Sequence, residues 1–266
     1  TLHIVRWLRG GVIRDRFRLM KWSKVILGRS VERRTIVAWV GAGRADRTVL
    51  VLAGMHGDEP KGVEVARRLV ELPGSTTREW RETPFDGETD RFLLGRGPPP
   101  LLRGESRGTR WVIVPVVNPD GYEKRKRRNA RRVDINRNFP TGNWALGSRR
   151  RRMYGGPEPA SEPETRAVIH AVERYRPQRI ITIHSIGLRR FCNNYDGPGR
   201  ALAAAMKKHN GYPVTASIGY PTPGSFGSWA GRELGIAVVT LELPSLHSTK
   251  RCWEDNRAAL LRCGEW

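Results

Sequence analysis

Residues 49–60 constrain the fold of this chain more than any other stretch. They begin with an uncharged run of β-branched and leucine residues, which ends at Gly54, and they present His56 and Glu59 directly afterwards. An apolar run of this length suits a strand that is buried on both faces, as in a parallel sheet. In open α/β sheets, ligands bind just beyond the carboxyl ends of such strands. The stretch therefore predicts an α/β fold with a ligand site around His56 and Glu59.

The remainder of the 266-residue chain alternates predicted strands and helices, and its length suits one large domain with a substantial core. At 161–164, Ser161 is the expected cap of a helix that has Pro163 in its first turn. Neither an internal repeat nor a second domain is evident in the sequence. We expect strands at residues 35–40, 49–53, 111–117, 179–183, 214–218 and 236–241, and helices from Glu59 to Pro73 and at about 163–175, 201–209 and 249–262.

Two segments fall outside this alternation. Residues 1–28 mix apolar residues with Arg and show no sustained period. We interpret them as an N-terminal basic extension or docking arm, with binding to a membrane surface as a less favoured role, and residues 29–266 as the single domain. Residues 74–109 are polar and rich in Gly and Pro, which predicts a long surface excursion.

The chain is strongly basic, with 48 Lys and Arg against 26 Asp and Glu and a formal net charge of +22. Such a balance favours anionic partners. The simpler explanation of the charge is that arginines are spread over a solvated surface. No apolar run approaches the ~20 residues that cross a bilayer, so we expect no transmembrane segment. Three cysteines without C-x-x-C spacing favour a reducing compartment.

Three of the predicted strands are followed by a residue that can bind a metal or a proton. His56 and Glu59 follow the strand at 49–53, His184 follows the strand at 179–183, and Glu242 follows the strand at 236–241. Because the carboxyl ends of parallel strands share one edge of a sheet, these side chains can meet at one site. Two histidines and one carboxylate complete the ligand set of a catalytic zinc ion. We therefore predict one Zn²⁺ per chain, with Glu242 as the general base for its water.

Around these residues the sequence resembles the zinc metallocarboxypeptidase family. The resemblance covers roughly residues 28–262 and implies a three-layer α/β/α fold with a mixed, mostly parallel central sheet. It also implies hydrolysis of an amide bond near the C-terminus of a peptide. The motifs that carry it follow one another in the family's order, and they are His56-Gly57-Asp58-Glu59, Asn118-Pro119-Asp120-Gly121-Tyr122, Asp134-Ile135-Asn136-Arg137-Asn138-Phe139, His184 and Thr240-Leu241-Glu242.

The resemblance implies a role for each matching residue. His56, Glu59 and His184 would bind the zinc ion, and Glu242 would act as base and proton shuttle. The other four positions would contact the substrate. Among them, one arginine would stabilise the oxyanion, an Asn-Arg pair would bind the terminal carboxylate, and a mobile tyrosine would close over the substrate; in that order they are Arg127, Asn136 with Arg137, and Tyr220.

Two further stretches, residues 154–165 and 219–229, resemble the bacterial members of this family that cleave the γ-D-glutamyl–meso-diaminopimelate bond of murein peptides. A murein-derived peptide carries several carboxylates, which a basic cleft would steer and hold. The alternatives are a general or polyglutamate carboxypeptidase, an N-acyl amino acid deacylase, and a non-catalytic polyanion-binding protein. No motif indicates specific nucleic-acid binding. We expect the bacterial cytoplasm as the location, or the periplasm if the N-terminus is processed, and we leave the oligomeric state open.

Overall fold

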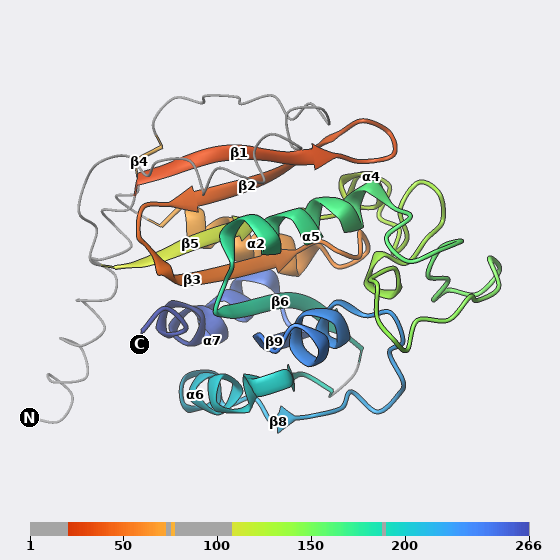
Figure 1. Cartoon of the computed structure of the whole chain (residues 1–266). Helices are drawn as coiled ribbons and strands as arrows, with labels where there is room; N and C mark the ends of the chain where they lie inside the picture. Colours follow the sequence, from red (N-terminus) through yellow and green to blue (C-terminus); the bar gives the residue numbers. More distant parts are fainter. Residues whose placement is uncertain (1–20, 73–75, 78–107, 188–189, 266) are drawn as a thin grey trace, which may run out of the picture.

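A mixed nine-stranded sheet runs through the part of the chain that the computed structural model describes, which is residues 21–72, 76–77, 108–187 and 190–265 (Figure 1). The strand order is β4-β1-β2-β5-β3-β6-β9-β7-β8. The pairs β1–β2, β2–β5 and β7–β9 are antiparallel, and the other five pairs are parallel. The strands are β1 (Lys21–Arg29), β2 (Thr35–Gly41), β3 (Arg44–Ala53), β4 (Thr76–Thr77), β5 (Thr109–Val114), β6 (Arg179–Ile186), β7 (Cys192–Asp196), β8 (Val214–Thr215) and β9 (Ala237–Pro244).

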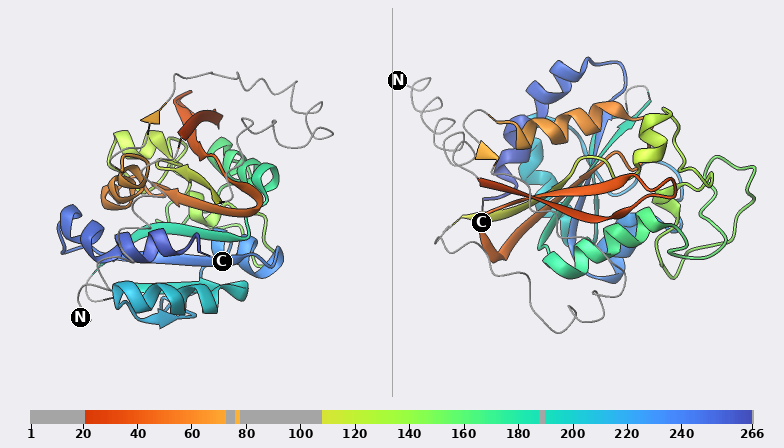
Figure 2. Two further views of the ribbon diagram at one scale, coloured as in Figure 1. Left: turned by 90° about the vertical axis from the view of Figure 1, so that its left-hand side faces the viewer. Right: turned by 90° about the horizontal axis from the view of Figure 1, so that it is seen from above.

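Helices cover both faces of this sheet, which confirms the predicted three-layer α/β/α fold with a mostly parallel sheet (Figure 2). On one face lie α2 (Pro60–Val70), α6 (Arg200–Asn210) and α7 (Thr249–Arg262). On the other face lie α5 (Pro163–Tyr175) and the π-helix η3 (Gly227–Glu233). Shorter helical segments in the connections are α4 (Pro119–Glu123), η1 (Ile135–Arg137) and η2 (Gly197–Gly199).

The central strand β3 is buried on both faces, as its uncharged run predicts. Val49 and Val51 pack into the core that includes α2, α6 and α7, whereas Leu50 and Leu52 pack into the core that includes α5. All four side chains are inaccessible to solvent or nearly so. Because alternate residues of a strand point to opposite faces, a strand between two helical layers must be apolar at every position.

Residues 21–28, which we predicted to belong to an N-terminal extension, are instead part of strand β1. This strand pairs with β2 from Trp22 to Arg29, with a bulge between Ile26 and Gly28, and it buries Trp22 in one core and Leu27 in the other. The boundary at residue 28 was therefore wrong. Residues 1–20 of the predicted extension lie outside the described residues, as does most of the predicted excursion at 74–109.

Several other differences from prediction concern the ends of elements. Helix α5 begins at Pro163, but its N-cap is Glu162 rather than Ser161. Strands β6 and β9 each continue two residues beyond His184 and Glu242, and the strand predicted at 214–218 ends at Thr215. Strand β7 and helix η3 were not predicted. No helix in the described part of the chain is both long and apolar enough to cross a membrane.

Candidate metal and substrate site

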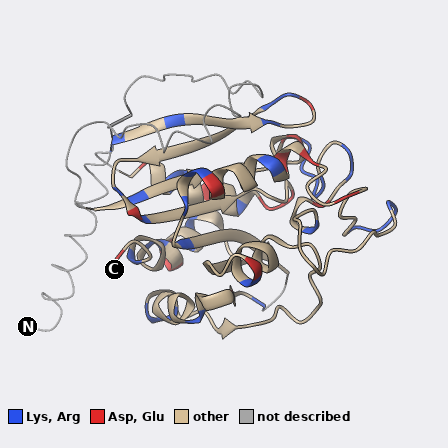
Figure 3. Cartoon of the chain, viewed as in Figure 1, with Lys and Arg blue, Asp and Glu red and all other residues tan. Residues whose placement is uncertain are grey.

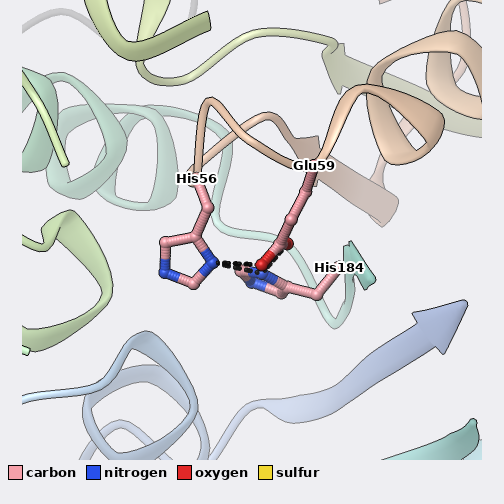
Figure 4. Close-up of side chains that lie close together, drawn as sticks. All are labelled: His56, Glu59 and His184. Carbon is pink, nitrogen blue, oxygen red and sulfur yellow. Dashed lines mark hydrogen bonds and ion pairs between the residues drawn. The ribbon is translucent and has the colours of Figure 1, made fainter. Parts of the chain in front are cut away.

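Two buried histidines and a partly buried glutamate converge at the carboxyl edge of the sheet (Figure 4). The carboxylate of Glu59 lies between two imidazoles, with Oε1 at 2.8 Å from Nδ1 of His56 and Oε2 at 2.9 Å from Nδ1 of His184. The two Nδ1 atoms are 3.1 Å apart. These three residues are the predicted metal ligands, and the structure brings all of them together.

The turn after β3 places two of these ligands. Gly54 ends the strand with a φ of +62°, a left-handed conformation that favours glycine. The amide of Val117 donates to the carbonyl of Ala53, which ties this turn to the chain that follows β5. Helix α2 then starts at Pro60, with Glu59 as its N-cap. The Glu59 side chain makes no capping hydrogen bond and faces the two histidines instead.

The third ligand and the predicted base come from neighbouring parallel strands. His184 on β6 is the register partner of Glu242 on β9. Paired residues of parallel strands point to the same face, so the two side chains lie side by side. Both are buried, and both contribute to the wall of the same pocket. The predicted convergence of strand-end residues is therefore present, although each strand continues beyond them.

Gly57 holds the chain after His56 against helix α4. A Cβ atom at this position would lie 1.9 Å from the carbonyl carbon of Gly121, so only glycine permits this approach of the two backbones. The amide of Gly57 donates to the carbonyl of Arg127 at 3.4 Å. The contact thus brings the basic run that follows α4 next to the metal ligands.

Asp134 is a site residue to which sequence reasoning assigned no role. Its Oδ1 is 3.0 Å from Nε2 of His56, and its Oδ2 accepts a hydrogen bond from Nε of Arg127 at 2.9 Å. A carboxylate in this position accepts a hydrogen bond from Nε2–H of the imidazole and leaves the Nδ1 lone pair free for a metal. The signal was available, because Asp134 opens the Asp-Ile-Asn-Arg motif, but only the fold brings it to His56.

Burial and the neighbouring charges shift the pKa values of this cluster in opposite directions. Burial lowers the pKa of His56, but attraction by Glu59 and Asp134 outweighs it, and the pKa rises to about 9. Burial also lowers the pKa of His184, where the attraction of Glu59 does not compensate. The pKa of Glu59 falls well below its ordinary value, because the two histidines outweigh its burial.

The ligand set fits zinc. Two imidazole nitrogens and one carboxylate are the donors of many catalytic zinc sites, in which metal–ligand distances of about 2.0–2.2 Å place neighbouring ligand atoms roughly 3.3 Å apart. The observed separations of 2.8–3.1 Å are close to that value. In addition, Asp134 fixes the ring of His56 so that the same nitrogen faces Glu59 and His184.

Glu242 lies beside these ligands without joining them. It is 6% exposed, and burial together with the negative charge of Glu59 raises the pKa of its carboxyl to about 8. The side chain lines a pocket of about 840 Å³ that also contains all three ligands. A carboxylate in this position can exchange a proton with a water molecule or substrate at the metal.

The predicted substrate residues Arg127, Asn136, Arg137 and Tyr220 line the same pocket. Arg137 is buried, and its Nε has no hydrogen-bond partner among the described residues. Burial lowers the pKa of Arg137, and Asp134 and Tyr220 oppose that change. The Asn136 side chain accepts a hydrogen bond from the amide of Phe226 at 2.9 Å, which fixes it against the segment that follows Tyr220.

The pocket wall also includes an exposed arginine. Arg152 lines the pocket, is largely exposed and lies 3.7 Å from Asp58. Figure 3 shows further Lys and Arg residues on the loops that follow α4. These loops contain the basic runs 124–128 and 149–152. An anionic ligand would therefore approach through a region of positive charge.

Comparisons with known proteins are consistent with a zinc site at this position. The model of the Peptidase M14 family, zinc carboxypeptidase, matches residues 104–251. Murein peptide amidase A of Escherichia coli K12 is 32% identical over 233 residues, which span 83% of this chain and 81% of that protein. The protein of the same name from Vibrio campbellii is 31% identical, over 82% of this chain and 78% of its own length.

Solved structures show the same fold. The crystal structure of the murein-tripeptide amidase MpaA from E. coli O157 has a TM-score of 0.65 and 27% identity, and the match covers 92% of each chain. Carboxypeptidase A from Helicoverpa armigera has a TM-score of 0.66 at 17% identity, covering 95% of this chain and 69% of that one. Together with the His56–Glu59–His184 cluster, these matches establish that the chain belongs to the Peptidase M14 family of zinc carboxypeptidases and is a zinc metallopeptidase.

Proposed function

We propose that this zinc metallopeptidase cleaves the γ-D-glutamyl–meso-diaminopimelate bond of murein peptides, an amide bond near the C-terminus of a carboxylate-rich substrate. The observation that carries the proposal is the buried guanidinium of Arg137, which shares the pocket with the zinc ligands and whose Nε has no hydrogen-bond partner in the described part of the chain. A planar guanidinium is suited to bind a carboxylate bidentately. The terminal carboxylate of a peptide bound there would bring its last amide bond towards the zinc ligands.

His56, Glu59 and His184 hold the metal in this proposal, and Asp134 orients His56. When bound, zinc supplies a Lewis acid that acidifies water and polarises a carbonyl group. Glu242 removes a proton from the attacking water and then delivers it to the leaving amine. The ionised form of Glu242, which this step requires, is favoured once a cation occupies the neighbouring ligand set.

The remaining pocket residues bind and orient the substrate. Arg127 is partly buried and lies beside Asp134 and Glu59. We assign it to stabilise the negative charge that develops on the carbonyl oxygen. Asn136 and Arg137 bind the terminal carboxylate. Tyr220, which is half-buried and lies close enough to Arg137 to affect its pKa, covers the bound substrate.

Two observations support murein peptides as the substrate class. The relatives that match most of this chain at 31–32% identity are named murein peptide amidases. The pocket also carries several cationic side chains, among them Arg127, Arg137 and Arg152, which suit a substrate with more than one carboxylate. An ordinary peptide would use only the contact with its terminal carboxylate.

A substrate panel tests this proposal. The zinc-loaded protein is incubated separately with L-Ala-γ-D-Glu-meso-diaminopimelate, ordinary C-terminal peptides, polyglutamate peptides and N-acyl amino acids, and products are identified by mass spectrometry. We expect hydrolysis of the first substrate at the γ-D-glutamyl bond, with a kcat/KM well above those of the others. Turnover of another class together with no cleavage of the γ-linked tripeptide would refute the murein assignment and leave the zinc peptidase intact.

A further inference from the structure

Two basic loops lie side by side next to the catalytic pocket. The first comprises residues 124–133, which follow α4, and the second comprises residues 141–157, which come after η1. Neither loop contains Asp or Glu. Nη1 of Arg128 in the first loop donates hydrogen bonds to the carbonyls of Arg149 and Arg151 in the second, at 3.2 and 3.3 Å. The two loops therefore form one cationic surface, which we call the basic face.

Many cations on the basic face are exposed and have no carboxylate beside them. Among the exposed ones, Lys124, Arg131 and Arg152 each lie near an acidic side chain. A partner with many negative charges would neutralise the remaining cations together. These form no ion pair with a residue that the structure describes, and they are Arg125, Lys126, Arg132, Arg149, Arg150 and Arg151.

The second loop also exposes apolar side chains. Every residue from 145 to 153 is exposed, and Leu146 is 70% and Met153 42% exposed. The base of this segment is closed, because Nε1 of Trp144 donates a hydrogen bond to the carbonyl of Gly155 at 3.4 Å. Figures 1 and 2 show that the loop projects beyond the helices and strands of the fold. Its arginine run thus lies between two exposed apolar side chains on a projecting segment.

An anionic membrane surface suits this combination better than a nucleic acid does. Lys and Arg bind anionic headgroups, and apolar side chains beside them bind at the boundary with the acyl chains. Single-stranded nucleic acids need exposed aromatic rings for stacking, whereas Tyr122 is covered by Arg125 at 4.8 Å and Trp144 is half-buried. Neither loop contains a helix or strand that could enter the major groove of a duplex.

We propose that the basic face docks the enzyme on a membrane that contains anionic lipids. The exposed Lys and Arg side chains contact the headgroups, and Leu146 enters the boundary between headgroups and acyl chains. Because Arg152 and Met153 also line the catalytic pocket, the docked enzyme holds this pocket next to the membrane surface. Docking does not depend on which bond the enzyme cleaves, so it goes beyond the proposed function and is tested without a peptide substrate.

Co-sedimentation with lipid vesicles tests the docking. The zinc-loaded full chain is mixed with vesicles of phosphatidylcholine alone, or of phosphatidylcholine and phosphatidylglycerol in equal amounts. We expect binding to the mixed vesicles only. Added salt should weaken this binding, because it screens charges that are exposed to solvent. Equal binding to both kinds of vesicle, or binding to neither, would contradict the proposal.

Two double substitutions distinguish the basic face from the net charge of the whole chain. A Lys or Arg near an anionic surface strengthens binding by roughly 5-fold, so Arg150→Gln/Arg151→Gln should weaken binding to the mixed vesicles by roughly 25-fold. The matched control, Lys207→Gln/Lys208→Gln, removes two neighbouring charges from exposed positions of α6 and should bind nearly as tightly as the wild type. Equal losses in the two variants would mean that net charge alone attracts the protein, and the inference would be wrong.

The apolar contact separates a membrane from other polyanions. Leu146→Gln should weaken binding to the mixed vesicles by roughly 10-fold, because the leucine side chain no longer leaves water. It should leave the affinity for duplex DNA, measured by fluorescence anisotropy, unchanged. Leu246→Gln, at an 82% exposed position between β9 and α7, is the matched control and should change neither affinity. If Leu146→Gln binds the vesicles as the wild type does, or if the protein binds DNA but not the vesicles, the membrane assignment is wrong.

Discussion

Glu242 carries a carboxyl group that the fold keeps away from water and beside a second carboxylate. Burial and the charge of Glu59 raise its pKa to about 8, from an ordinary value of 4.5. Because the folded pKa exceeds the unfolded one, the protonated carboxyl stabilises the folded protein fully below pH 4.5. That contribution is lost as the pH rises through about 8. Without zinc, the residue proposed as the base therefore destabilises the fold at neutral and alkaline pH.

Replacing Glu242 by Gln should remove this pH dependence from the zinc-free protein. The free energy of unfolding of Glu242→Gln should resemble that of the wild type near pH 5 and exceed it by on the order of a few kcal/mol near pH 9. Denaturant unfolding of both proteins in chelator, at intervals of one pH unit, measures the difference. Zinc should reduce this difference in the free energy of unfolding, because a cation favours the ionised carboxylate. Parallel stability curves across this pH range would show that Glu242 is ionised in the zinc-free fold.

Some residues of the site could be predicted from the sequence, and others could not. His56, His184 and Glu242 follow or end apolar runs, so their place at one edge of the sheet can be predicted from strand patterns alone. Asp134 contacts His56 across 78 residues of sequence, in a loop whose course no local pattern determines. Asp196 and Arg232, which line the same pocket, likewise meet only after β7 and η3 have packed together.

Among the secondary-structure elements, strands with long apolar runs were predictable, whereas β1 and β7 were not. Strands β3, β6 and β9 show continuous apolar runs. Strand β1 shows no regular alternation, because its register with β2 shifts between Ile26 and Gly28. Strand β7 reads Cys-Asn-Asn-Tyr-Asp, a composition that disfavours strands in general. It is held in place by tertiary contacts, including reciprocal side-chain hydrogen bonds between Asn193 and Asn210.

Strand β1 contributes to the core, so a substitution of its buried residues should destabilise the fold. Leu27 is 1% exposed and packs in the core on the α5 face, so Leu27→Ala should lower the free energy of unfolding by about 2–5 kcal/mol. Ser23→Ala, at an exposed position of the same strand, should change it by less than about 0.5 kcal/mol. Chemical denaturation of the zinc-loaded proteins measures both values. A neutral Leu27→Ala would mean that residues 21–28 behave as the detachable extension that the sequence suggested.

Considered as a whole, the molecule brings distant parts of its chain to one point. His56 and Glu59 follow β3, and His184 lies in β6, 128 residues after His56. Strands β3 and β6 are neighbours in the middle of the sheet. A zinc ion bound by these residues therefore joins the turn between β3 and α2 to the adjacent strand. Since the metal binds the folded arrangement and not the unfolded chain, its binding free energy adds to the stability of the fold.

Removal of zinc should consequently lower the thermal stability of the entire protein in one transition. With free zinc at about 1,000 times its dissociation constant, the folded state gains roughly 4 kcal/mol. We expect a chelator to lower the Tm of the wild type and one equivalent of zinc per chain to restore it, as followed by calorimetry with metal analysis. His184→Gln should abolish the zinc-dependent rise, whereas His209→Gln, at an exposed position of α6, should retain it. An equal rise in both variants would place the bound zinc elsewhere and contradict the assignment of the three ligands.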